Sequence, residues 1–119
     1  MFTSDQIKMA SLARGAEMIE SNMAESDKWL IRGLLAIFDK QTSDEQWACS
    51  TQHHNKVGFT GPDSYLMSKF AKQVKSWEGT PPQDRRYPTP LSPRQREITR
   101  ERMPKYAGQL ARIVRARVG

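Results

Sequence analysis

Residues 27–40 are apolar on nearly every side when they are drawn as a helix. Their polar side chains Lys28, Arg32 and Asp39 fall within one narrow strip of the helical wheel, and large apolar side chains cover the rest. A helix of this kind has to be enclosed by other elements. The chain is therefore limited to folds in which residues 27–40 lie at the centre.

Further helices are expected on both sides of this central one. Capping-box patterns begin at Thr3 and Ser43, Ser26 is a good N-cap, and Pro62 suits the first position of a helix. Neither strand alternation nor an internal repeat is found in the sequence. The sequence predicts an all-α fold of about five helices around 27–40, with other helices over 5–22, 43–49, 62–77 and 93–119, a break at 21–22 and a loop over 51–61.

Helix 62–77 has a predicted core stripe and a basic outer face. Lys72 and Lys75 lie on the outer face. The stripe consists of Leu66, Phe70, Val74 and Trp77.

Five of the seven prolines lie between residues 81 and 93, so no helix or central strand can pass through that stretch. Ser92 and Pro93 then form a good helix start, and Pro104 should kink or split the helix that follows. With 119 residues the chain is expected to form one domain. Its parts are a near-neutral helical body over 1–78, an exposed proline-rich linker over 79–92, and basic C-terminal helices over 93–119.

The net charge of +6 is concentrated near one end of the chain. Residues 84–119 carry ten positive and three negative side chains, whereas residues 1–83 carry nine positive and ten negative ones. Such asymmetry indicates a polyanionic partner, and the alternative is a helix whose outer face is simply solvated by arginines.

Arginine suits contacts with phosphate because its planar fork makes paired hydrogen bonds. Part of the charge can also support the helix, since Glu101 and Lys105 form a favourable pair four residues apart. No signature of base-reading side chains stands out, so sequence-specific recognition is not expected. The candidate residues for binding nucleic acid or another partner are Arg85, Arg86, Arg94, Arg96, Arg100, Arg102, Lys105, Arg112, Arg115, Arg117, Lys72, Lys75 and Lys56.

Few residues suggest catalysis or metal binding. Cys49, His53 and His54 form a metal-like cluster, but no second Cys or His pair completes a zinc site. The two histidines lack the further partners that a nuclease would need, and Cys49 fits a buried, inert thiol. We therefore expect no enzymatic activity, no cofactor and no metal site.

The loop before helix 62–77 allows two interpretations. Lys56, the backbone around Gly58 and Gly61, and the following helix start could hold one phosphate or carboxylate. Asp63 would repel an anion there, so a turn shaped by glycines and capped by Asp63 is favoured.

The expected cellular location is inferred from the single cysteine and from the hydropathy of the sequence. A single Cys excludes an internal disulfide, the N-terminus lacks the order of a signal peptide, and the longest apolar run is Leu34 to Phe38. This length is far below that of a membrane span. The chain is expected to be cytoplasmic, with no membrane partner.

Three stretches, over 34–46, 54–63 and 91–110, resemble a pattern of small phage and plasmid proteins. That pattern has an aliphatic helix running into Q-T-x-D-E-Q, then H-N-x-V-G-F-x-G-x-D, and finally L-S-x-[KR]-Q and K-Y-x-x-Q-L. The resemblance implies an origin in a mobile element and work near DNA or RNA machinery, as an accessory module or as an inhibitor of a host enzyme. The matching residues are Gln41, Thr42, Asp44, Glu45, Gln46, His54, Asn55, Val57, Gly58, Phe59, Gly61, Asp63, Leu91, Ser92, Arg94, Gln95, Lys105, Tyr106, Gln109 and Leu110.

The leading hypothesis is a non-enzymatic, nucleic-acid-associated protein of a phage or plasmid. Its C-terminal basic helices would contact the phosphate backbone of DNA or RNA. The alternative is a phage-encoded interaction module that inhibits a host nucleic-acid enzyme or defence complex. In that case the same arginines would meet carboxylates.

Overall fold

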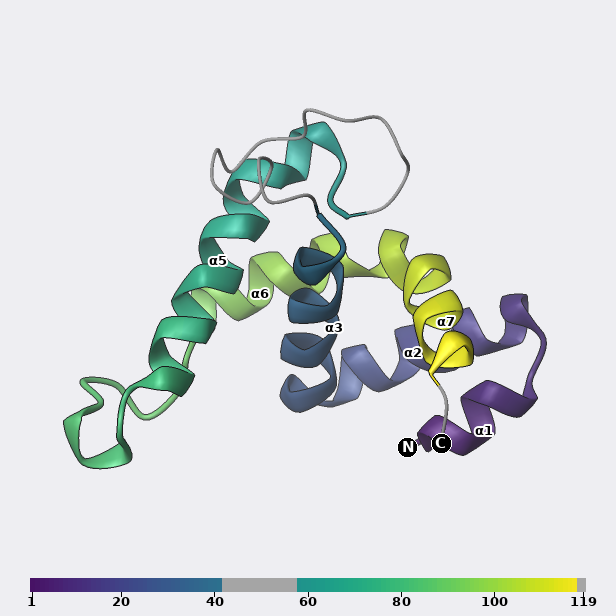
Figure 1. The fold of residues 1–119 in the computed structure, drawn as a ribbon, viewed down its shortest axis with the longest axis horizontal. Helices are drawn as coiled ribbons and strands as arrows, with labels where there is room; N and C mark the ends of the chain where they lie inside the picture. The colour runs from purple at the N-terminus through teal and green to yellow at the C-terminus, as the bar shows by residue number, and fades with distance from the viewer. Residues whose placement is uncertain (42–57, 118–119) are drawn as a thin grey trace.

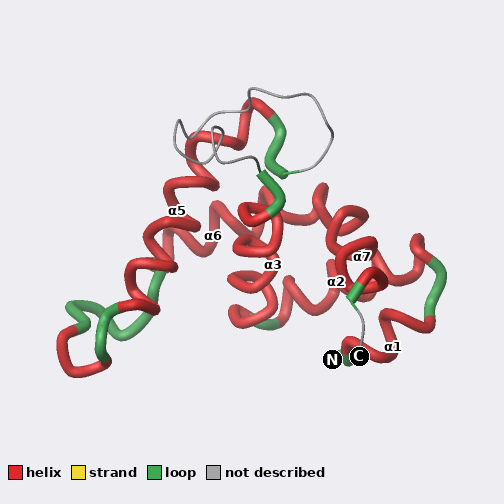
Figure 2. The backbone as a smooth tube through the Cα atoms, in the orientation of Figure 1, coloured by secondary structure: helices red, strands yellow, loops and turns green. Residues whose placement is uncertain are grey.

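A computed structural model describes residues 1–41 and 58–117, and every regular element in these two ranges is helical (Figures 1 and 2). The expectation of an all-α chain is confirmed. The helix expected over 43–49 lies outside the described residues, as does most of the loop over 51–61. The elements are α1 (Ser4–Met9), α2 (Leu12–Glu25), α3 (Asp27–Asp39), α5 (Gly61–Gly79), the 3-10 helix η1 (Pro82–Asp84), α6 (Pro93–Arg102), the 3-10 helix η2 (Met103–Tyr106) and α7 (Ala107–Ala116).

The N-terminal helix expected over 5–22 is in fact two helices. Thr3 and Gln6 form the predicted capping box at the start of α1, but α1 ends at Met9. Ser11 then caps α2, because its hydroxyl accepts a hydrogen bond from the backbone N–H of Arg14 at 3.2 Å. A second N-cap residue in mid-sequence therefore divides the segment.

The break expected at 21–22 was also wrong, since α2 continues to Glu25. Asn22 is fully buried in α2, where its side-chain amide bonds to the N-terminal backbone. Its Oδ1 accepts from the N–H of Phe2 at 2.9 Å, and its Nδ2 donates to the carbonyl of Phe2 at 2.8 Å. The Asn22 side chain, which suggested a turn, instead satisfies the hydrogen-bonding groups of the Phe2 backbone. The helix therefore does not end at Asn22.

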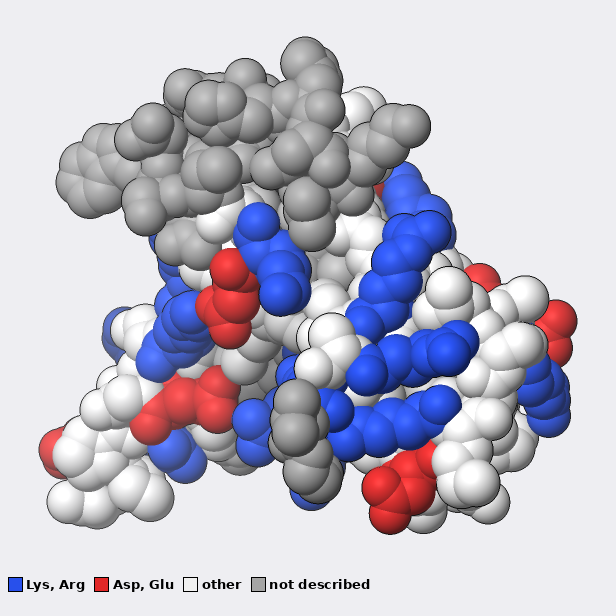
Figure 3. All heavy atoms as spheres, turned by 45° about the vertical axis from the view of Figure 1, so that its right-hand side comes forward, with Lys and Arg blue, Asp and Glu red and all other residues white. Residues whose placement is uncertain are grey.

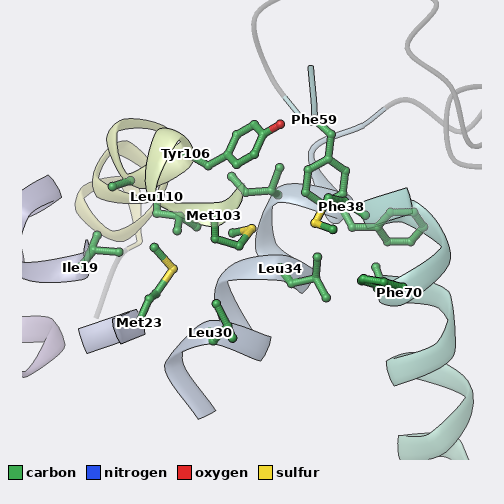
Figure 4. Packing of buried hydrophobic residues seen from close by; sticks show 14 of the residues in the cluster. Ile19, Met23, Leu30, Leu34, Phe38, Phe59, Phe70, Met103, Tyr106 and Leu110 are labelled. Carbon is green, nitrogen blue, oxygen red and sulfur yellow. The ribbon is translucent and has the colours of Figure 1, made fainter. Parts of the chain in front are cut away.

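α3 occupies the centre of the fold, as its sequence predicts. Leu30, Leu34 and Ile37 have no exposed surface, and α3 contacts α2, α5, α6 and α7. Figure 4 shows Leu30 and Leu34 among buried side chains of neighbouring helices, including Met23 of α2 and Phe70 of α5. The packing is close at Gly33, where an added Cβ would lie 3.1 Å from Met23 Sδ and 3.2 Å from Leu110 Cδ1.

α5 packs through a broader face than the predicted stripe. Phe70 and Val74 are buried as expected, but Leu66 and Trp77 are only half-buried. Trp77 was wrongly assigned to the core, because it lies near the end of α5, in an arm that projects from the helical body, where its ring contacts Arg85 (Figure 1). Met67 and Ala71 have no exposed surface and complete the buried face.

The proline-rich segment returns from α5 to α6 and is mostly exposed, as expected. It is also anchored: Leu91 is buried, Gln73 Nε2 donates to the carbonyl of Pro90 at 2.9 Å, and Trp77 Nε1 donates to the carbonyl of Tyr87 at 2.9 Å. The segment is therefore an exposed strap that is anchored along α5.

Pro104 splits the C-terminal helix as predicted. α6 stops at Arg102, η2 makes one tight turn, and α7 begins at Ala107. Met103 and Tyr106 of η2 are buried, and the ring of Tyr106 meets that of Phe59 edge-on at 5.5 Å between centroids. Across the described ranges, no helix combines the length and apolar character needed to cross a membrane.

Candidate nucleic-acid interface

The basic residues predicted to bind a partner are carried mainly by α6, η2 and α7. α6 starts where the sequence indicates, because Ser92 and Gln95 form a capping box and Pro93 occupies the first turn. The structure then separates these residues into those that pair within the protein and those that do not.

Two arginines of α6 are used to fasten it to the corner between α2 and α3. Arg100 Nη2 lies 2.6 Å from the Asp27 carboxylate, and Arg96 Nη1 lies 3.7 Å from the other oxygen of that carboxylate. Arg100 Nε also donates to the carbonyl of Met23 at 3.2 Å. The hydrogen bond from Arg100 lowers the pKa of Asp27, and it outweighs the opposing effect of burial.

Two further cations surround Asp63, whose carboxylate is almost fully buried in the first turn of α5. Arg102 Nη1 lies 2.9 Å and Lys105 Nζ 2.7 Å from its oxygens, and the Tyr106 hydroxyl donates to it at 2.5 Å. Burial alone would raise the pKa of Asp63, but the hydrogen bonds from Lys105, Tyr106 and Arg102 together lower it. Burial and the Asp63 hydrogen bond raise the pKa of Tyr106 to about 12.

The sequence predicts Asp63 only as a cap at the start of a helix, and the structure adds long-range partners on α6 and η2. Thr60, the residue at the N-cap position, makes no side-chain cap bond, although its hydroxyl lies 3.5 Å from Asp63 and 3.2 Å from the Tyr106 hydroxyl. No local spacing could reveal partners some 40 residues away. An acidic residue at a helix start after a glycine loop was the only available signal.

Other predicted binding residues also have intramolecular contacts. Arg94 pairs with Glu97 at 3.2 Å on the exposed side of α6. Lys75 Nζ lies 2.7 Å from the Asp39 carboxylate and 5.1 Å from the centre of the Phe38 ring. Lys72 is exposed on α5, where it too has a partner, and Lys56 lies outside the described residues.

Arg85 and Arg86 lie in the strap between α5 and α6. The Arg85 guanidinium stacks 3.7 Å from the centre of the Trp77 ring, and its Nε donates to the carbonyls of Trp77 and Thr80. Arg86 is exposed and pairs with no acidic side chain in the described ranges.

α7 presents the arginines that remain. Arg112 and Arg115 are exposed on one side of the helix, and Arg117 follows its last turn. None of the three forms an ion pair with a residue of 1–41 or 58–117. The opposite side of α7 is buried through Ala107, Leu110, Ala111 and Val114.

Figure 3 turns the α7 side of Figure 1 toward the viewer. Several Lys and Arg side chains lie next to one another on this face, and acidic side chains lie mainly toward its margins. The sequence from Arg102 to Gly119 contains five Lys and Arg residues and no Asp or Glu. Asp63 pairs with Arg102 and Lys105, whereas Arg112, Arg115 and Arg117 form no ion pair with the described residues and leave an excess of positive charge at α7.

Within the described ranges, no three His, Cys, Asp or Glu side chains lie close enough together to hold a metal ion. Cys49, His53 and His54 fall outside those ranges. Comparisons of the chain with protein-family models, with curated proteins and with solved structures found no match.

Proposed function

We propose that this protein binds nucleic acid without catalysing a reaction, and that α7 contacts the phosphate backbone. The observation that supports the proposal most is the position of Arg112 and Arg115. They lie three residues apart on the exposed side of a helix whose other side is buried, and residues 102–119 contain no Asp or Glu.

The intramolecular pairs narrow the predicted interface. Arg96 and Arg100 are used at Asp27, and Arg102 and Lys105 at Asp63. These cations would have to break existing pairs to bind phosphate, at a cost in stability. The exposed arginines of α7 carry no such cost, so they are the main contacts in the proposal.

Backbone contact of this kind is independent of base sequence. Each arginine that reaches a phosphate releases counterions, and affinity then falls steeply as salt is added. We also propose a cytoplasmic location and a mobile-element origin, the latter from the resemblance in the sequence alone.

Titration of labelled single-stranded and double-stranded oligonucleotides with the full chain tests the proposal. We expect binding at low ionic strength that weakens as salt is raised. No binding at low salt, or an affinity that does not respond to salt, would contradict it.

The alternative partner is an acidic surface on a host protein that processes nucleic acid. A pulldown from nuclease-treated host extract separates the two partners. The alternative would be favoured if one defined host protein stays bound to this protein after nuclease treatment and is not displaced by added oligonucleotide.

A further inference from the structure

A groove of about 980 Å³ lies between the end of α5 and the start of α6, on the arm that projects from the helical body. The strap of residues 80–92 forms one of its walls. In Figure 1 this arm lies at the opposite side of the view from α7. The groove is therefore a surface distinct from the one assigned above to the phosphate backbone.

Two aromatic side chains line the groove. Trp77 is half-buried, and its Nε1 is bonded to the backbone of Tyr87, which fixes the strap against the indole. The Tyr87 side chain is left 65% exposed. A large ring that remains in water beside a second, anchored ring provides a stacking surface.

The charge of the groove is positive. Arg85 is stacked on Trp77, and Arg86, Arg94 and Arg96 also line the groove, whereas Asp84 is its single acidic lining residue. Among the described residues Arg94 forms an ion pair with the exposed Glu97, and exposed pairs of this kind are weak. An anionic occupant with flat, apolar faces matches this surface.

The groove is already formed in the free protein. Gln73 and Gln95 exchange side-chain hydrogen bonds at 2.8 and 3.0 Å across it, and Gln73 also bonds to the carbonyl of Pro90. Several prolines restrict the backbone of the strap. A ligand would therefore lose little affinity to ordering of the protein.

We propose that this groove binds a short stretch of single-stranded nucleic acid. Bases stack on Tyr87 and beside the Trp77–Arg85 pair, and Arg86 and Arg94 contact the phosphates. A duplex keeps its bases stacked inside, so it cannot offer them to these rings. The inference rests on the proposed function, because it assumes the same class of partner, but it uses different residues.

The test compares binding of a labelled oligothymidylate and of a labelled duplex to the full chain and to variants. Tyr87→Ala should weaken binding of the single strand by about tenfold, which is within the range known for one base–aromatic contact, and leave duplex binding unchanged. Tyr87→Phe keeps the ring and should bind as the parent does. Tyr65→Ala is the matched control, because Tyr65 is 58% exposed on α5 and does not line the groove.

A second pair of variants separates this inference from the proposed function. If Tyr87→Ala binds the single strand as tightly as the parent, while Arg112→Gln with Arg115→Gln loses binding, the groove proposal is wrong and the α7 proposal stands. The reverse pattern supports the groove and contradicts the assignment of α7. A parent that binds neither probe, or that binds polyglutamate in the groove more tightly than the oligonucleotide, contradicts the groove proposal.

Discussion

Lys105 places its ammonium group 2.7 Å from the buried carboxylate of Asp63, and so joins η2 to the first turn of α5. Arg102 and the Tyr106 hydroxyl reach the same carboxylate. The C-terminal basic segment therefore has two cations, Arg102 and Lys105, that pair with Asp63 inside the protein. Farther along the chain, Arg112, Arg115 and Arg117 form no ion pair with the described residues.

Replacement of Asp63 by Asn should destabilise the protein by about 2–3 kcal/mol, because it removes charge-assisted hydrogen bonds from a buried position and leaves Lys105 and Arg102 without their anion. Urea unfolding of parent and variant at neutral pH measures the difference. Glu20→Gln is the matched control, since Glu20 is exposed on α2 and forms no ion pair with the described residues. An equal decrease in unfolding free energy in Asp63→Asn and Glu20→Gln would contradict a stabilising role for the ion pairs of Asp63.

The contribution of Asp63 should also depend on pH. Its pKa is below the ordinary value of 3.8, so the native state binds fewer protons than the unfolded state. The stabilisation is therefore complete above pH 3.8 and is lost as the pH falls through the lower, native value. The stability difference between the parent and Asp63→Asn should shrink on acidification in that range, whereas a difference that grew would contradict the assigned charge state.

Gly58 is predicted to resist substitution. Its φ is +89°, and an added Cβ would lie 2.5 Å from Gln41 Cγ. Its backbone N–H and carbonyl also bond to the Gln109 side chain at 3.0 and 3.1 Å. Gly58→Ala should cost about 1–3 kcal/mol in unfolding free energy, because both the backbone region and the space are unfavourable.

Gly108→Ala is expected to raise the unfolding free energy, in contrast to Gly58→Ala. Gly108 lies in α7 and an added Cβ would meet nothing within 4 Å, so the better helix propensity of alanine should stabilise the protein by up to about 1 kcal/mol. If both alanine variants shifted stability in the same direction, the local account of the two glycines would be wrong.

Local signals in the sequence were enough to predict much of the fold. The wheel of 27–40 placed α3 at the centre, and Ser92, Pro93 and Pro104 gave the bounds of α6 and the split before α7. These features depend on the chemistry of neighbouring residues. The division between α1 and α2 was missed although Ser11 carries the signal, because a continuous apolar period outweighed a single cap residue.

Long-range features could not be predicted in the same way. The carboxylates of Asp27 and Asp63 find cations that lie 73 and 42 residues away, in Arg100 and Lys105, and no spacing rule connects them. Asn22 was misread for the same reason, since its partner is the backbone of Phe2. The intramolecular ion pairs of the candidate interface, which engage Arg96, Arg100, Arg102 and Lys105, were therefore not predicted.

The central claim concerns α7, and the salt dependence of oligonucleotide binding tests it most directly. The logarithm of the association constant is measured against the logarithm of salt concentration for the parent and for the double variant Arg112→Gln with Arg115→Gln. We predict a linear decline for the parent and a slope reduced by about 2 in the variant, one unit for each lost phosphate contact. An unchanged slope and affinity in the variant would contradict the assignment of these arginines to the phosphate backbone.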